Sequence, residues 1–218
     1  MAISSLSPNG KVMLETPNSL NYTNSQGEQA LKNPETALTE IVREVNNVNQ
    51  MGQRTSVSIQ DKNDDYTRYY VNQTKDGSLM LQPNPEAQVA GKEAVYFNKK
   101  YDTDDKGNVK RTEQGEPLYY FVMNKEAPAA QELLNNMKVK ENNGYQNLAV
   151  SVQIANPELA KELKEYQRPE GDNSKVVAIL SKDEIKISTV NELASAKAER
   201  SSQEQTKAEP QKSQDMDR

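Results

Sequence analysis

Apolar and polar residues alternate most regularly between Glu93 and Ile154, and this stretch also holds most of the aromatic side chains. Alternate residues of the segment 94–101 are apolar, a period of two that predicts a strand. In the segment 118–123 the residues that would face each side of a strand are all apolar, which predicts a central strand covered on both faces. The segment 148–154 alternates again and predicts a half-buried strand.

The first predicted helix begins at Pro34 and ends before Gly52. Asn33 stands in the capping position, and proline is favoured at the first helical position. Glycine just past the last apolar residue is typical of a helix end. We expect its apolar stripe to face the core, and the stripe consists of Leu38, Ile41, Val42, Val45 and Val48.

Three further helices are expected. One covers residues 127–137, and another follows Asn156-Pro157, which repeats the cap-then-proline start. The last begins at Thr189, which forms a capping box with Glu192 three residues later.

Tight turns favour an antiparallel sheet. Asp76-Gly77 is a two-residue hairpin signal that joins the strand 66–72 to the strand 78–82, and Asn143-Gly144 marks another turn. Such turns are too short for the crossover that parallel strands need.

These elements predict an α+β fold, a mostly antiparallel sheet of about six to eight strands covered by two or three helices. We expect one domain over residues 34–190. Residues 1–33 lack a sustained period and are expected to form a mostly disordered arm, with Lys11–Glu15 as an edge strand at most. Residues 191–218 are expected to form a frayed helix and a disordered polar tail.

Composition narrows the function classes. The net charge is −5 with both signs interspersed, which argues against a strongly basic nucleic-acid surface. The absence of cysteine fits a reducing compartment, and no signal peptide or apolar run of ~20 residues is visible. We therefore expect a cytoplasmic protein without a membrane partner, and secretion without a signal peptide stays open.

Motifs for catalysis are missing from the chain. Without histidine and cysteine, the usual zinc, haem and thiol sites and a histidine-dependent triad cannot form. Asp102 and Asp104 before Gly107 match a calcium loop in part, but Lys106 places a cation at the third ligand position. A polar hairpin tip is the prediction there, and we expect no enzyme, no cofactor and no metal site.

Tyrosine is the one residue type whose distribution suggests a binding surface, because most of the ten tyrosines fall on predicted strands. Rings beside cations on a sheet stack bases and follow a phosphate backbone, and tyrosine and arginine are also enriched at protein interfaces. A third interpretation is that tyrosine fills a sheet poor in Phe and Trp. The candidate binding surface consists of Tyr66, Arg68, Tyr70, Tyr96, Lys99, Lys100, Tyr101 and Tyr119.

Part of the chain resembles a known family. The sequence of elements is a strand, an acidic turn with Gly107, the strand 118–123, the helix 127–137 and the strand 148–154, with a polar tail after them. This order is similar to that of bacterial single-stranded DNA-binding proteins of the OB-fold type, over about a third of the chain. The chain departs from the family in lacking tryptophan and an acidic-hydrophobic tip.

The predicted function is non-enzymatic binding through the tyrosine-rich sheet face or a sheet edge. A protein-binding accessory factor, such as an inhibitor, adaptor or effector, is favoured because an acidic chain is repelled by phosphates. The expected partner is then another protein. The alternative is a single-stranded nucleic-acid-binding protein with an OB-like core.

Overall fold

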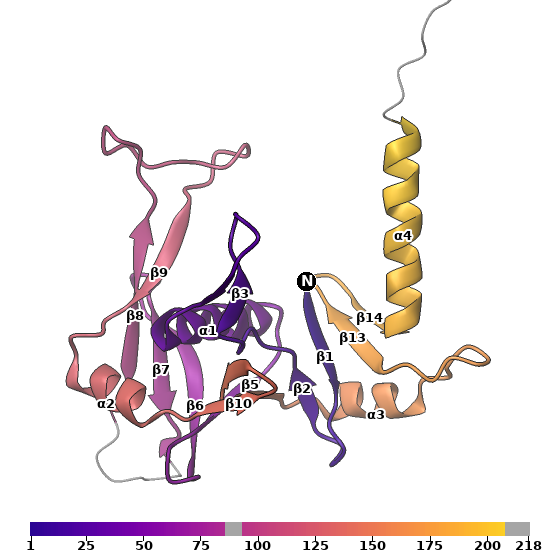
Figure 1. Ribbon diagram of the computed structural model, residues 1–218, viewed down its shortest axis with the longest axis horizontal. Helices are drawn as coiled ribbons and strands as arrows, with labels where there is room; N and C mark the ends of the chain where they lie inside the picture. The colour runs from indigo at the N-terminus through magenta and orange to yellow at the C-terminus, as the bar shows by residue number, and fades with distance from the viewer. Residues whose placement is uncertain (86–92, 208–218) are drawn as a thin grey trace, which may run out of the picture.

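The computed structural model describes residues 1–85 and 93–207, and its centre is a ten-stranded, fully antiparallel sheet (Figure 1). In sheet order the strands are β14 (Ile185–Thr189), β13 (Val176–Leu180), β1 (Ala2–Leu6), β2 (Val12–Leu14), β12 (Val150–Ile154), β5 (Thr55–Gln60), β6 (Tyr66–Gln73), β7 (Leu79–Pro83), β8 (Val95–Tyr101) and β9 (Tyr119–Met123). Two small hairpins stand apart from this sheet, β3 (Asn21–Thr23) with β4 (Gln29–Leu31) and β10 (Val139–Asn142) with β11 (Tyr145–Leu148).

The described helices are α1 (Pro34–Gln50), α2 (Pro128–Asn136), α3 (Pro157–Glu165) and α4 (Val190–Lys207). The prediction of an α+β fold with a mostly antiparallel sheet is confirmed, and the sheet has more strands than expected.

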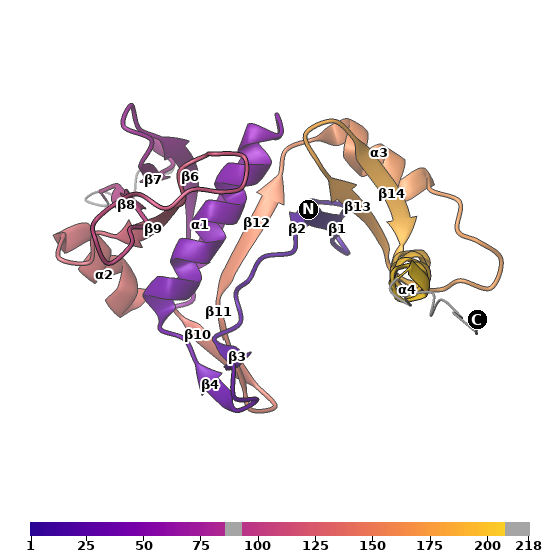
Figure 2. The same cartoon turned by 90° about the horizontal axis from the view of Figure 1, so that it is seen from above.

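One face of the sheet carries the hydrophobic core, and we call it the inner face. The register aligns Leu14, Val152, Val57 and Tyr69 across four neighbouring strands, all of them buried. The predicted stripe of α1, from Leu38 to Val48, is fully buried against this face. The buried side chains of α2 and α3 belong to the same core. Figure 2 shows β12 running between two halves of the molecule, one with β1, β2, β13 and β14 and the other with α1 and β5–β9. The opposite side of β5–β9 and β12 is the outer face.

The first 33 residues differ from the predicted disordered arm. β1 lies between β13 and β2 inside the sheet, with Ser4 opposite Ala178 on one side and opposite Leu14 on the other. β2 is likewise interior and not an edge strand. The folded unit therefore extends to the N-terminal side of the predicted range 34–190. Two serines, Ser4 and Ser5, are buried in β1, which removes the apolar alternation that marks a strand.

The strand β9 also differs from its prediction. The sequence indicates a central strand, but β9 ends the sheet, and Tyr119, Tyr120 and Val122 are 51%, 50% and 42% exposed. A strand that is apolar on both faces usually has layers on both sides. Within the described part of the chain, no further strand pairs with the free edge of β9, and no helix covers its outer face (Figure 1).

One turn geometry recurs along the chain. In the β6–β7 loop the N–H of Thr74 donates to the Ser78 carbonyl and the N–H of Gly77 donates back to the Thr74 carbonyl, with Gly77 at φ +82°. This is a type I turn followed by a left-handed residue, a longer loop than the predicted two-residue turn. The same pair of backbone bonds closes the loops that begin at Ser7, Asn24, Asp61, Asp104 and Thr112.

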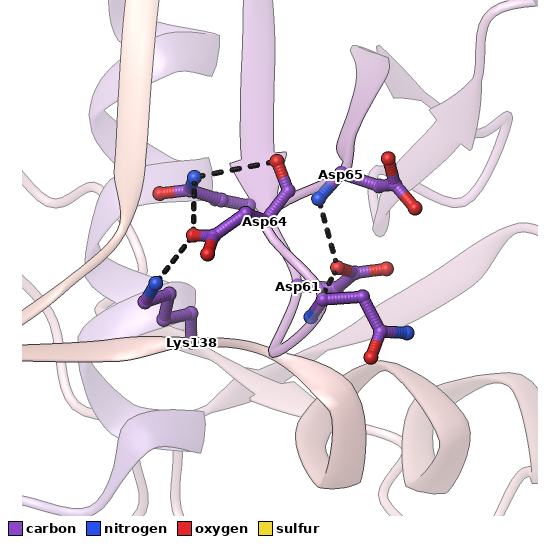
Figure 3. A network of polar contacts seen from close by, with 6 residues as sticks. Asp61, Asp64, Asp65 and Lys138 are labelled. Carbon is purple, nitrogen blue, oxygen red and sulfur yellow. Dashed lines mark hydrogen bonds and ion pairs between the residues drawn. The ribbon is translucent and has the colours of Figure 1, made fainter.

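The loop between β5 and β6 uses this geometry without glycine. Asp64 takes the left-handed position at φ +70°, and its carboxylate accepts a bond from the Gln60 amide and pairs with Lys138 (Figure 3). The Asp61 carboxylate accepts the N–H groups of Asn63 and Asp65 at 2.8 and 3.0 Å. Side-chain contacts thus offset the cost that a residue with a Cβ meets at positive φ.

The last helix stands apart from the body (Figure 1). Its predicted capping box is confirmed, because the Thr189 N–H donates to the Glu192 carboxylate at 2.7 Å and the Glu192 N–H donates to the Thr189 hydroxyl at 3.2 Å. α4 runs to Lys207, and the predicted tail beyond it lies outside the described residues. Across residues 1–85 and 93–207, none of the helices combines the length and apolarity that crossing a bilayer requires.

Candidate functional site

The structure divides the eight predicted binding residues between the two faces of the sheet. Successive side chains of a strand point to opposite faces. The outer face receives Tyr66, Arg68, Tyr70, Tyr96 and Lys100, and the inner face receives Lys99, Tyr101 and Tyr119. The five tyrosines among them are exposed. One continuous patch is therefore replaced by two surfaces, which meet at β9.

The inner-face group forms a compact cluster at the ends of β8 and β9. The Lys99 ammonium lies 4.1 Å from the ring centroid of Tyr119 and 5.4 Å from that of Tyr101. The Tyr119 ring meets Phe121 edge to face at 5.6 Å. A cation over an exposed ring contributes ~0.5–1 kcal/mol. These contacts hold the aromatic side chains of the β9 end in place.

The backbone of β9 has one paired side and one free side. The Asn124 N–H donates to the Tyr96 carbonyl at 2.8 Å, and the Asp102 N–H donates to the Leu118 carbonyl at 2.9 Å. In an antiparallel ladder hydrogen-bonded pairs alternate, so the N–H and C=O groups of Tyr119 and Phe121 point away from β8. They have no backbone partner among the described residues.

The two ends of the sheet are protected unequally. β14, at the far end, carries Lys186 within the strand, and a charged residue discourages pairing with a foreign strand. β9 reads Tyr-Tyr-Phe-Val-Met, with neither charge nor proline. An apolar edge of this kind invites strand addition, so the β9 edge is the stronger candidate of the two.

A groove of about 340 Å³ runs beside this edge, between β9 and the first half of α1. Phe121 and Met123 supply apolar surface, and Glu35 and Glu40 are each paired with a lysine, at 3.9 Å from Lys125 and 2.7 Å from Lys32. Arg43 also lines the groove and has no ion pair with any residue that the structure describes. The groove thus combines apolar contacts with one cation that is available to a ligand.

Beyond β8 and β9 the chain forms two splayed loops, which we call the fork (residues 102–118; Figure 1). Its base is a ring of three backbone bonds: the N–H of Asp102 donates to Leu118, that of Leu118 to Lys110, and that of Lys110 to Asp102, at 2.8–2.9 Å. The Asp104 carboxylate accepts bonds from the Asn108 side-chain amide and from the backbone N–H groups of Asn108 and Lys106. These bonds, with the Asn108 side chain first, lower the pKa of Asp104. The predicted polar hairpin tip is therefore confirmed, with its carboxylate used inside the turn.

Several residues of these surfaces were not in the predicted set. Tyr120 and Val122 lie at the exposed edge, and Arg43 and Lys125 line its groove. The apolar run 118–123 was the available signal, but a run of this kind fits a buried strand and an exposed binding strand equally well. Arg43 lies on the polar side of an amphipathic helix, where sequence alone offers no reason to single it out.

Comparison of the chain with protein-family models, with curated proteins and with solved structures finds no match. Function is therefore inferred from the geometry of these surfaces.

Proposed function

We propose that this is a non-enzymatic binding protein whose β9 edge takes an extended segment of a partner protein as an eleventh strand. The observation that carries the proposal is the free, uncharged and aromatic-rich edge of β9 at the end of the sheet. Added strands gain affinity from main-chain hydrogen bonds and specificity from pockets for alternate side chains. The outward N–H and C=O groups of Tyr119 and Phe121 would form the main-chain hydrogen bonds, and the groove against α1 would receive the alternate side chains.

The groove indicates the kind of segment that fits. Apolar side chains of the partner would pack on Phe121 and Met123, and an acidic side chain would pair with Arg43. Charge-assisted bonds to arginine are stronger than neutral ones. An extended segment with apolar and acidic residues in alternation suits this surface best. An inhibitor, adaptor or effector would act by this mode of binding, and the lack of histidine and cysteine in the chain supports binding over turnover.

A proline substitution tests the proposal directly. Proline is tolerated on an edge strand where its missing N–H faces solvent, and Tyr119 is such a position. The variant Tyr119→Pro should fold but bind no strand. The matched control is Ile185→Pro, because the backbone N–H of Ile185 points outward at the opposite edge.

The readout has two steps. A photo-reactive side chain at Thr36, which is exposed and lines the groove, identifies the partner in extract from the native cell, with the same group at the exposed Tyr145 as control. The purified partner is then titrated while amide exchange is followed. We expect the N–H groups of Tyr119 and Phe121 to become protected, and Tyr119→Pro alone to abolish binding. A cross-linked product of two copies of this chain, or protection confined to other strands, would contradict the proposal.

A further inference from the structure

The outer face of β6–β9 carries no carboxylate on any strand position that points outward. This is notable in a chain with 32 acidic residues against 27 basic ones. Arg68 and Lys100 are the charged residues of the face, and no helix covers it in the described part of the chain (Figure 2). The outward side chains are Tyr66, Arg68, Tyr70, Asn72, Met80, Gln82, Tyr96, Asn98, Lys100, Tyr120 and Val122.

Tyrosines cross this face along a diagonal. Tyr66 and Tyr70 lie on β6, Tyr96 lies two strands away beside Met80, and Tyr120 lies on β9 beside Lys100. Strands ~4.8 Å apart and ~3.4 Å per residue place the ends of this track roughly 35 Å apart. All four rings are at least a third exposed. The face thus offers several aromatic surfaces in succession along a path as long as a short oligonucleotide.

A hollow of about 750 Å³ lies where this face meets the ends of β5 and β12. Three cations from separate segments line it: Lys11 before β2, Arg54 before β5 and Arg68 on β6. Tyr70, Asn72 and Gln153 complete the polar wall, and the lining includes no carboxylate.

These cations lack internal partners. Neither Lys11, Arg54 nor Arg68 makes an ion pair or a side-chain hydrogen bond with a described residue. Like charges that face one hollow repel one another, and a bound anion relieves that repulsion.

We propose that the outer face and this hollow bind single-stranded nucleic acid. Phosphates lie over Arg68, Arg54 and Lys11, and bases stack on Tyr70 and Tyr96. The proposal does not rest on strand addition at the β9 edge, because neither the hollow nor these two tyrosines touch that edge. It concerns a second ligand at a separate surface.

The aromatic side chains favour nucleic acid over an acidic peptide as the ligand. A peptide of Asp and Glu would need the cations alone, whereas every base offers a flat face to a tyrosine ring. A duplex is a poorer fit, because its bases are already stacked and its major groove admits a helix or ribbon. The face described here is a broad sheet, which is the platform that single strands use.

The test uses the full chain and labelled oligothymidylate and oligouridylate of about twelve nucleotides. We expect both to bind at low salt. The logarithm of the binding constant should fall linearly with the logarithm of the salt concentration, with a slope of about −0.7 for each phosphate neutralised. Arg54→Ala and Arg68→Ala should each weaken binding and reduce this slope, while Lys140→Ala, an exposed lysine on β10, should change neither.

The stacking contribution is tested separately. Tyr70→Ala should lower affinity about tenfold without changing the salt slope, and Tyr70→Phe should keep the wild-type affinity. Tyr145→Ala removes an exposed ring elsewhere and should have no effect. Thermal unfolding of each variant confirms that the fold persists.

Two results would overturn the proposal. One is no binding of either oligonucleotide at low salt. The other is binding of an oligoglutamate peptide as tightly as the oligonucleotides with no effect of Tyr70→Ala, which would assign the hollow to acidic peptides. A preference of oligouridylate over oligothymidylate, or the reverse, would tell RNA from DNA and leave the ligand class unchanged.

Discussion

Adjacent tyrosines of β6 show how far one residue's surroundings decide its role. Tyr69 is 3% exposed on the inner face, whereas Tyr70 is 36% exposed on the outer face. Burial, together with the carboxylates of Glu132 and Asp61, raises the pKa of Tyr69 to about 12, against a smaller opposing effect of Thr67. The alternation of the strand predicts that the two rings face opposite ways, but not which face is covered.

The raised pKa of Tyr69 gives the fold a pH dependence. The native state favours the neutral phenol, so its contribution to stability is complete below the unfolded-state pKa near 10 and is lost as pH rises towards 12. Between pH 9 and 11 we expect the wild type to lose about 1 kcal/mol more unfolding free energy than Tyr69→Phe. Urea unfolding at both pH values measures this, and an equal loss in both proteins would contradict it.

The helices α1 and α3 both begin with an Asn-Pro pair but differ in their N-terminal caps. The Asn156 side chain accepts the Leu159 N–H at 2.9 Å and donates to Gln53 at 2.9 Å. Asn33 precedes Pro34 in the same way but makes no side-chain cap bond. We expect Asn156→Ala to cost about 1–2 kcal/mol of unfolding free energy and Asn33→Ala a few tenths. Chemical denaturation of the two variants provides the comparison, and equal losses would refute the distinction.

The start of α4 is held by two carboxylates. Asp172 accepts bonds from Thr189, Ser174 and Asn191, and these donors, with Thr189 first, lower its pKa to about 2. The pKa of Glu192 is lowered mainly by the Thr189 N–H and the Tyr166 hydroxyl. Depressed pKa values stabilise the fold above the unfolded-state values near 4, and this stabilisation is lost as pH falls towards 2.

Acid should therefore loosen α4 before the core. We expect amide exchange at residues 189–193 to accelerate between pH 4 and pH 2.5, after correction for intrinsic rates, while β12 stays protected. Asp172→Asn should remove part of this pH dependence. Uniform loss of protection across the chain at the same pH would show that these carboxylates do not act locally.

The elements that the sequence predicts well are those with local signals. Asn-Pro pairs start α1 and α3, and Thr189 with Glu192 starts α4. The strand β1 has no such signal, because what buries it is Ala178–Leu180, at the other end of the chain. The placement of β9 also escaped prediction, since its apolar pattern suits either a covered strand or an exposed one. The sequence singled out the exposed tyrosines, but not their division between the two faces of the sheet.

At the scale of the whole molecule, β12 joins the two halves. It pairs with β2 on one side and β5 on the other, and Val152 lies opposite Leu14 and Val57 with no exposed surface. The molecule should therefore unfold as one unit. We expect Val152→Ala to cost about 2 kcal/mol and to lower native-state exchange protection equally in β1 and β6.

Val109→Ala, in the exposed fork, is the control for this experiment and should leave protection unchanged. If Val152→Ala affects only one half, the halves are separate folding units.

The placement of β1 has a consequence for how the protein is made. On the ribosome β1 and β2 emerge before the other strands of the sheet, and their partners β12 and β13 are translated long after them. The region from α1 to β9 has its contacts within reach and can form during translation. The hairpin of β1 and β2 must wait, with its apolar residues unpaired, until the segment that ends at Leu180 has left the exit tunnel. The ten-stranded sheet therefore closes only once β13 is available to pair with β1.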